Sequence, residues 1–224
     1  MATLREYGQA WALARRVREH SSVDPAAALA FARSESTIAP NQQDAEILWL
    51  LEQLAEAPPR VVLEIGTDRG GTLFLWTRVA APDALLLSLD VQKMVGRLGR
   101  FSPFALIRHS FERDEQRIEL IDEVDSHEPR TVEQVRTILG GRSVDFLFVD
   151  GDHRYESVRR DFDLYEPMVR PGGMVAFHDI SPCTTADTEG TAAFWAELKQ
   201  RHPTEEKIED GVAGYGIGVY RKPR

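Results

Sequence analysis

The apolar positions of the chain follow two patterns, one typical of buried strands and the other of amphipathic helices. Short, almost uninterrupted apolar runs predict strands that are covered on both faces, as in a parallel sheet. These runs occupy residues 61–65, 85–90, 144–149, 174–177 and 217–220, with a weaker candidate at 119–124. Apolar residues at three- and four-residue spacing predict intervening helices, among them 155–169 and 192–200. The alternation of strands and helices predicts an α/β fold with a mostly parallel sheet and right-handed crossovers.

The N-terminal part of the chain shows only helical patterns. Ile47, Leu51 and Leu54 recur at helical spacing and define one apolar face. The alanine-rich residues 25–33 predict a second helix, capped by Asp24. We therefore expect an N-terminal helical segment followed by an α/β domain, with bounds of 1–56 and 57–224.

Composition narrows the class of protein. The 224 residues suit one soluble domain with a substantial core, and 42% of them are hydrophobic. A net charge of −9 argues against broad binding to nucleic acid or to an anionic membrane surface. No apolar run approaches the roughly 18 residues of a membrane span, and the N-terminus does not resemble a secretory signal. Cys183 is the single cysteine, which excludes an internal disulfide and favours a cytoplasmic protein; we assign it no function.

A glycine-rich turn follows the first predicted strand in the sequence VVLEIGTDRGGT, residues 61–72. Gly66 and Gly70 allow a sharp bend and a close approach by a ligand, and the helix beyond them offers free N–H groups. A dinucleotide site would have a glycine at the position of Asp68, where a carboxylate disfavours a pyrophosphate. The turn therefore indicates a different nucleoside cofactor.

Two acids beside this turn define the cofactor further. Glu64, two residues before Gly66, suits an ammonium group. Asp90 ends the second predicted strand, at the place where an acid accepts hydrogen bonds from ribose hydroxyls. An amino acid joined to an adenosine satisfies both, which indicates S-adenosylmethionine. The alternative is a structural turn with Glu64 in a local salt bridge.

These motifs resemble those of a known family. Residues 64–67 (EIGT), with Gly70 and Gly71, look like motif I of the class I S-adenosylmethionine-dependent methyltransferases. The segment VDFLFVDGDHRYESVRRDF…VRPGGMVAFHDI, within residues 144–180, resembles the cephalosporin-hydroxylase-like and macrolide-sugar O-methyltransferase subgroup. The resemblance covers about residues 47–220. It implies a doubly wound, mostly parallel seven-stranded sheet, the Rossmann-like methyltransferase fold, and cofactor contacts from Glu64, Gly66, Thr67 and Gly70.

The resemblance also implies a metal site. Asp150 and Asp179 each follow a predicted strand, and in the doubly wound order these strands are neighbours, about 4.8 Å apart. Two carboxylates held together need a cation between them, and oxygen ligands favour Mg²⁺. Relatives bind the metal through one Asp and then an acidic pair. Here His178 precedes Asp179, so we expect Asp150, His178 and Asp179 as ligands, with Mn²⁺ or Zn²⁺ as alternatives to Mg²⁺.

Two further residues receive roles from the resemblance. His153 lies on the same loop as Asp150 and titrates near neutrality, and in the sugar-methylating relatives the matching histidine is the catalytic base. Its alternative is a histidine bonded to a carboxylate such as Asp152. Ser126 follows the weak third strand, at a point that borders the adenine in the family; a polar loop is the alternative. Residues 93–142 hold either a solvated loop or a substrate lid.

The prediction is a metal-assisted O-methyltransferase that acts on a hydroxyl of a small molecule, a sugar or natural product. Its partners would be this acceptor and a second copy in a homo-oligomer, with no nucleic acid and no membrane. A non-haem iron oxygenase is an alternative, because Asp150, His153 and His178 supply two histidines and a carboxylate. A nicotinamide oxidoreductase and a non-catalytic S-adenosylmethionine-binding protein are the others.

Overall fold

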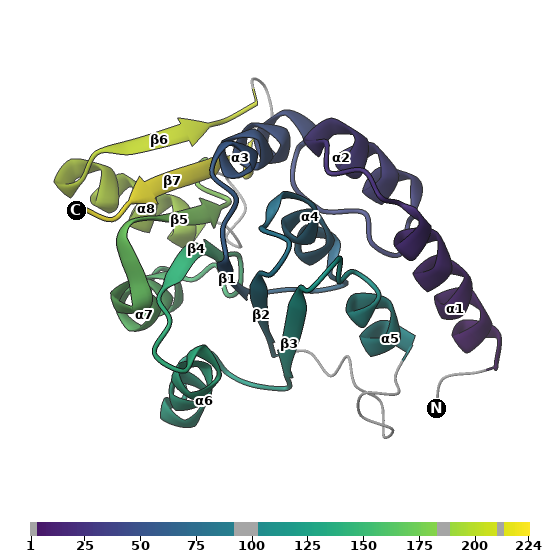
Figure 1. Cartoon of the computed structure of the whole chain (residues 1–224). Coiled ribbons are helices and arrows are strands. Elements are labelled where there is room, and N and C mark those ends of the chain that lie inside the picture. The colour runs from purple at the N-terminus through teal and green to yellow at the C-terminus, as the bar shows by residue number, and fades with distance from the viewer. Residues whose placement is uncertain (1–3, 92–102, 183–188, 210–212) are drawn as a thin grey trace.

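The fold is a seven-stranded sheet between two layers of helices (Figure 1). A computed structural model describes residues 4–91, 103–182, 189–209 and 213–224. The strands are β1 Val61–Ile65, β2 Leu85–Asp90, β3 Arg117–Asp122, β4 Val144–Val149, β5 Val169–His178, β6 Thr204–Lys207 and β7 Ile217–Arg221. The helices are α1 Leu4–Glu19, α2 Pro25–Ser34, α3 Asp44–Glu56, α4 Gly71–Val79, α5 Pro103–His109, α6 Pro129–Leu139, α7 Tyr155–Tyr165 and α8 Glu189–Arg201.

The order of the strands is β3-β2-β1-β4-β5-β7-β6. The pairs from β3 to β5 are parallel, whereas β7 runs antiparallel to both β5 and β6. The order reverses at β1 and β4, and ligands bind at such a switch point, outside the carboxyl ends of the strands. The predicted doubly wound, mostly parallel seven-stranded fold is confirmed.

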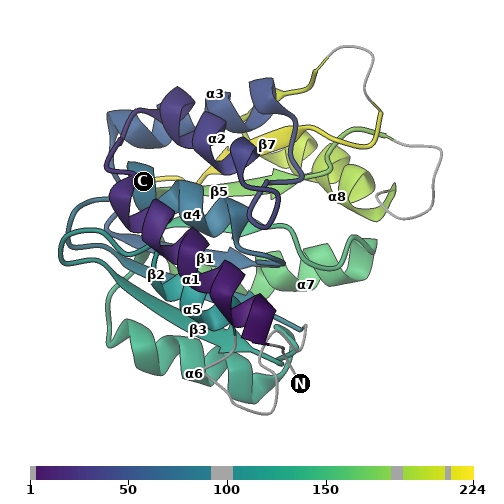
Figure 2. The same cartoon turned by 90° about the vertical axis from the view of Figure 1, so that its right-hand side faces the viewer.

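Each face of the sheet has its own apolar core. Helices α1 to α5 cover one face, where Val62, Trp76 and Phe146 are buried. Helices α6, α7 and α8 cover the other, where Leu63, Val135 and Phe177 are buried (Figures 1 and 2). Successive β1 residues therefore face opposite cores, as the two-residue period of a strand requires.

The helical prediction for the N-terminal segment is confirmed, including its cap. Asp24 Oδ1 accepts a 2.8 Å hydrogen bond from the backbone of Ala27, and Pro25 begins α2. The segment packs on the sheet domain, since α1 contacts α5 and α2 contacts α4. The boundary at residue 56 stays a prediction.

Several predicted elements differ in their bounds, among them a helix and two strands. The helix expected over 155–169 ends at Tyr165 and passes through one turn of 3₁₀ helix into β5. The strand expected over 174–177 is longer, since β5 covers Val169–His178, and its pairing with β4 shifts between Val144 and Phe146. The third strand covers 117–122 rather than 119–124.

The described part of the segment suspected of being a lid is mostly regular structure. Residues 103–142 contain α5, β3 and α6, so they are not one long loop. Residues 92–102 lie outside the described residues, and so does Cys183. Among the described residues, none of the helices is long and apolar enough to cross a membrane.

Candidate active site

A cavity of about 870 Å³ opens at the carboxyl ends of the central strands. Its walls come from the turn after β1, the end of β2, the loop after β3, the loop after β4 and the end of β5. Asn41, from the segment between α2 and α3, and Tyr215, just before β7, complete the lining. The size falls within the range of small-molecule sites.

The turn between β1 and α4 depends on Gly66. This residue has φ +90°, and a Cβ placed on it would lie 1.9 Å from the carbonyl oxygen of Asp150. A side chain there is therefore excluded by conformation and by space. Gly70 also has a positive φ, +89°, and begins α4 as its N-cap. The turn after β1 and the loop after β4 are thus in direct contact, which places the two predicted sites next to each other.

Asp90 is fixed by the same turn. The backbone N–H of Asp68 donates a 2.6 Å hydrogen bond to Asp90 Oδ2. Both residues line the cavity, and Asp68 has an unusual φ of +44°. The predicted ribose acceptor therefore lies at the cavity wall.

Glu64 lies away from the cavity wall, because it faces the core beneath α4. It is fully buried, and its Oε1 accepts a 2.8 Å hydrogen bond from the indole of Trp76. Burial raises the pKa of Glu64 to about 7, since an ionised carboxylate there is poorly solvated. Thr67 is also buried, and its hydroxyl is paired with Ser88. Neither residue is among those that line the cavity, so their contacts with a cofactor stay predictions.

Ser126 also lines the cavity, where α7 holds the loop after β3. The Ser126 hydroxyl donates a 2.6 Å hydrogen bond to Asp161, which is buried. His127 Nε2 lies 3.2 Å from the same carboxylate oxygen. Burial raises the pKa of Asp161 to about 6. The predicted adenine-side residue is therefore held in place by a buried acid.

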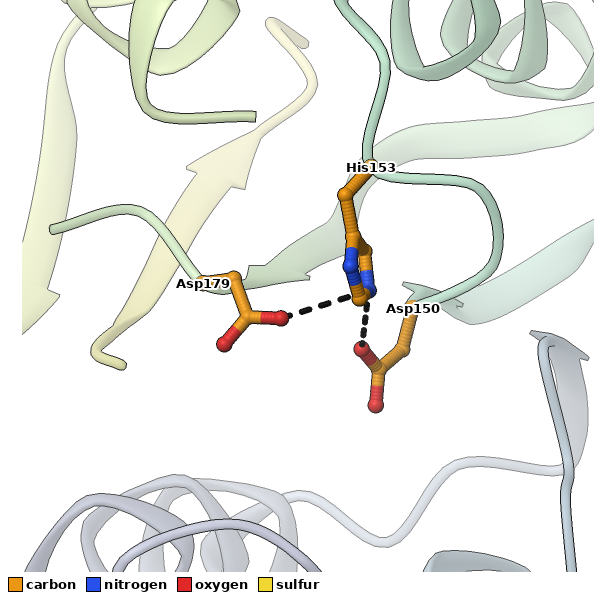
Figure 3. Close-up of side chains that lie close together, drawn as sticks. All are labelled: Asp150, His153 and Asp179. Carbon is orange, nitrogen blue, oxygen red and sulfur yellow. Dashed lines mark ion pairs between the residues drawn. The ribbon is translucent and has the colours of Figure 1, made fainter. Parts of the chain in front are cut away.

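The second predicted site brings its residues together. One ligand atom of each of Asp150, His153 and Asp179 lies within 4.8 Å of the other two (Figure 3). His153 Nε2 lies 3.2 Å from Asp179 Oδ2 and 3.7 Å from Asp150 Oδ1. Asp179 has a φ of +59°, the kind of backbone strain that clusters at functional sites. Asp152, the alternative partner of His153, pairs with Arg154 and Ser157 instead.

His178 lies between the two carboxylates. Its Nδ1 is 3.2 Å from Asp150 Oδ1 and 3.2 Å from Asp179 Oδ1, and the side chain is buried. Burial alone would lower the pKa of His178, but the two acids outweigh it and raise the pKa to about 10. Burial likewise opposes ionisation of Asp150, yet His178 and His153 hold the pKa of that carboxyl below its ordinary value. The neighbouring carboxylates of Asp150 and Asp179 raise the pKa of His153, against the opposing effect of its partial burial.

Gln42 is a site residue that the sequence did not reveal. Its amide donates a 2.7 Å hydrogen bond to Asp150 Oδ2, and only 3% of Gln42 is exposed. It lies in the N-terminal segment, 108 positions before Asp150, and no motif connects the two. Tyr215, whose ring centroid lies 5.9 Å from that of His178, was also missed, because no motif connects it with the site.

The comparisons with known proteins agree with this geometry. A family model described as methyltransferase domain matches residues 63–180, slightly more than half of the chain. The chain belongs to this methyltransferase family, and the predicted class I S-adenosylmethionine-dependent methyltransferase is confirmed. Family membership favours a methyltransferase over the iron oxygenase and the nicotinamide oxidoreductase.

Solved structures show the same fold. The cofactor-bound Rv0187 protein from MTB is 18% identical, with a TM-score of 0.60, and the match covers 90% of this chain and 91% of that one. An O-methyltransferase from Bacillus cereus, in complex with SAH, is 15% identical, with a TM-score of 0.57 and coverage of 92% and 100%. The O-methyltransferase TomG from Streptomyces achromogenes, in complex with SAM and involved in tomaymycin synthesis, is 16% identical, with a TM-score of 0.55 and coverage of 78% of both chains.

Two curated relatives match parts of the chain. Protein y4gI of Sinorhizobium fredii is 27% identical over 159 residues, 70% of this chain. Protein R132 of Acanthamoeba polyphaga mimivirus is 50% identical over 36 residues, 16% of this chain. The matches cover 16% of the length of each relative.

Proposed function

We propose that this chain transfers the methyl group of S-adenosylmethionine to a hydroxyl of a small molecule, assisted by a divalent cation. One observation carries the proposal. Gly66, in the turn after β1, lies against the backbone of Asp150. The Asp150 side chain lies beside those of His153 and Asp179 at the wall of one cavity. A methyl donor bound at this turn would therefore lie beside the group that activates the acceptor. Holding two reactants side by side in this way lowers the barrier to their reaction.

The cofactor end follows from the residues around Asp90. Asp90 would accept the ribose hydroxyls, and Ser126 would border the adenine. Two of the solved structures of similar fold are complexes with SAM or SAH, which supports the same cofactor here. Glu64 would act on the ammonium group from beneath the turn, through its buried charge.

The identity of the cation is inferred from the side chains that would bind it. Asp150 and Asp179 offer hard oxygen ligands, which favour Mg²⁺. The imidazole of His178, 3.2 Å from both acids, also suits Mn²⁺ or Zn²⁺. A cation held there supplies Lewis acidity that lowers the pKa of an acceptor hydroxyl.

We assign the proton transfer to His153. Its Nε2 would take the hydroxyl proton as the acceptor oxygen forms a bond to the methyl carbon. The bond between that carbon and sulfur breaks, which leaves S-adenosylhomocysteine. The imidazolium formed at His153 would be stabilised by Asp179 and Asp150, whose carboxylates lie 3.2 and 3.7 Å away.

The acceptor class is inferred from the cavity and from the relatives. TomG is involved in tomaymycin synthesis, and this supports a sugar or natural product as acceptor. The net charge of −9 supports the absence of nucleic acid and membrane partners. Self-association and a cytoplasmic location remain predictions.

Calorimetry with S-adenosylmethionine, NAD and divalent cations tests the proposal. S-adenosylmethionine should bind at one site, and NAD should give no heat. Mg²⁺ or Mn²⁺ should bind the wild-type protein but not Asp150→Asn. If S-adenosylmethionine binds but no divalent cation does, the protein is a metal-independent methyltransferase or a non-catalytic binding protein. Tight Fe²⁺ binding without S-adenosylmethionine would instead support the oxygenase.

A further inference from the structure

Arg108 is a fully buried arginine behind the cofactor turn. It lies on α5 and does not line the cavity. Its Nη1 donates a 2.7 Å hydrogen bond to Asp122 Oδ1 at the end of β3. Its Nη2 donates to the backbone carbonyl of Asp68. A buried guanidinium is costly unless its donors are paired, so this arrangement calls for an explanation.

The carbonyl of Asp68 supplies that explanation. Asp68 has φ +44°, a conformation that residues other than glycine rarely adopt. Its N–H points to Asp90, and its carbonyl points to Arg108. Both backbone polar groups of this strained residue are therefore satisfied: the N–H by Asp90 at the cavity wall, and the carbonyl by the buried Arg108.

We propose that Arg108 is a positioning residue for the cofactor: it holds Asp68, and through Asp68 it fixes Asp90 for the ribose. Asp122 balances the charge of Arg108, so the position of the guanidinium is defined from β3. Gly70 leaves room for the same side chain, because a Cβ there would lie 3.2 Å from Arg108 Cγ. This inference rests on the proposed binding of S-adenosylmethionine.

Arg78 provides a matched control. It is a second buried arginine on the same face of the sheet, and it also donates to backbone carbonyls, those of His20 and Phe111. Neither carbonyl belongs to the cofactor turn or lines the cavity. Replacement of either arginine removes a buried charge and should destabilise the fold. Only Arg108 should affect the cofactor.

The test is calorimetric titration of S-adenosylhomocysteine into wild type, Arg108→Met and Arg78→Met. We expect Arg108→Met to weaken binding about tenfold, the effect of one well-placed hydrogen bond, and Arg78→Met to leave binding unchanged. If Arg108→Met does not fold, Arg108→Lys replaces it. That variant keeps the charge but cannot bridge Asp122 and Asp68 as the planar guanidinium does, so binding should again weaken.

A double-mutant cycle separates positioning from general stability. If Arg108 acts through Asp90, then Arg108→Met should weaken binding much less in an Asp90→Asn background than in wild type. Equal effects in both backgrounds, or unchanged affinity in the Arg108 variants, would overturn the inference while leaving the proposed function intact. Failure of the wild-type protein to bind S-adenosylhomocysteine would overturn both.

Discussion

The amide of Gln42 donates a 2.7 Å hydrogen bond to Asp150 Oδ2, across 108 positions of sequence. The other oxygen of that carboxylate faces His178 and His153. One oxygen of Asp150 is thus held by the N-terminal segment, and the other is directed to the cluster that we propose as the cation site. The N-terminal segment therefore contributes a contact to the candidate active site.

Replacing Gln42 should weaken the binding of a divalent cation. In Gln42→Leu, Asp150 loses the donor that orients it, and loss of such a partner usually lowers metal affinity by about 10- to 100-fold. Titration with Mn²⁺ measures this effect, and affinity for S-adenosylhomocysteine should not change.

Gln53→Leu is the control for this experiment. Gln53 belongs to the same segment, but it bonds with Arg221 and does not line the cavity. Equal Mn²⁺ affinity in wild type and Gln42→Leu would show that Asp150 needs no support from the N-terminal segment.

Replacing His153 distinguishes a catalytic base from a metal ligand. If it is the base, His153→Ala should lower kcat by about 10²- to 10⁴-fold and leave the affinity for the cation nearly unchanged. Asp150→Asn, measured beside it, should lose the cation. The two variants must be compared because His153 lies close enough to both acids to share a cation with them. A loss of cation affinity as large as that of Asp150→Asn would identify His153 as a ligand instead.

Binding of the cation should release a proton. Without a metal, the pKa of His178 is about 10, so this residue is an imidazolium at neutral pH. Its attraction to Asp150 and Asp179 stabilises the fold below pH 6.5 and is lost as pH rises through about 10. A cation must displace that proton, so its affinity should increase from about pH 7 to 9.

Titrations in two buffers of different ionisation enthalpy count the protons released. We expect wild type to release about one proton more per cation than His178→Asn. Identical heats in both buffers for wild type would show that His178 is neutral before the cation binds.

Glu64 should make stability depend on pH. Its pKa is about 7 in the folded protein and 4.5 when solvated, so the folded state holds the proton more tightly. The carboxylate therefore destabilises the fold progressively as pH rises from 4.5 to about 7, and fully above that. Glu64→Gln removes this penalty and should gain roughly 3 kcal/mol over wild type at about pH 8, with little difference at about pH 4.5.

Urea denaturation of the cofactor-free protein at both pH values measures the difference. The same variant should bind S-adenosylmethionine more weakly, because its neutral amide offers no charge to the ammonium group. A stability difference independent of pH would mean that Glu64 stays ionised in the folded protein.

The strands that build the site were predictable because each is a buried apolar run. β1, β2, β4 and β7 were found within one residue, since burial on both faces requires such runs. β6 was missed because its sequence, TEEK, is mostly exposed at the edge of the sheet and carries no apolar pattern. The strand order came from the family resemblance, not from the patterns themselves.

The residues of the candidate site could be predicted only where they belong to a sequence motif. Asp150, His153 and Asp179 follow strands whose carboxyl ends meet, so their approach could be expected. Gln42 and Arg108 could not be found in this way. Each reaches the site through long-range packing, and neither stands at a characteristic distance from the residue it supports.

Methyl transfer from labelled S-adenosylmethionine to a panel of sugars, phenols and macrolides tests the central claim most directly. Each reaction is run with the protein as purified, with excess chelator, and with chelator followed by Mg²⁺. We predict an O-methylated product that the chelator abolishes and Mg²⁺ restores, while S-adenosylmethionine stays bound throughout. Transfer at full rate in excess chelator, with no metal detected in the protein, would contradict the account.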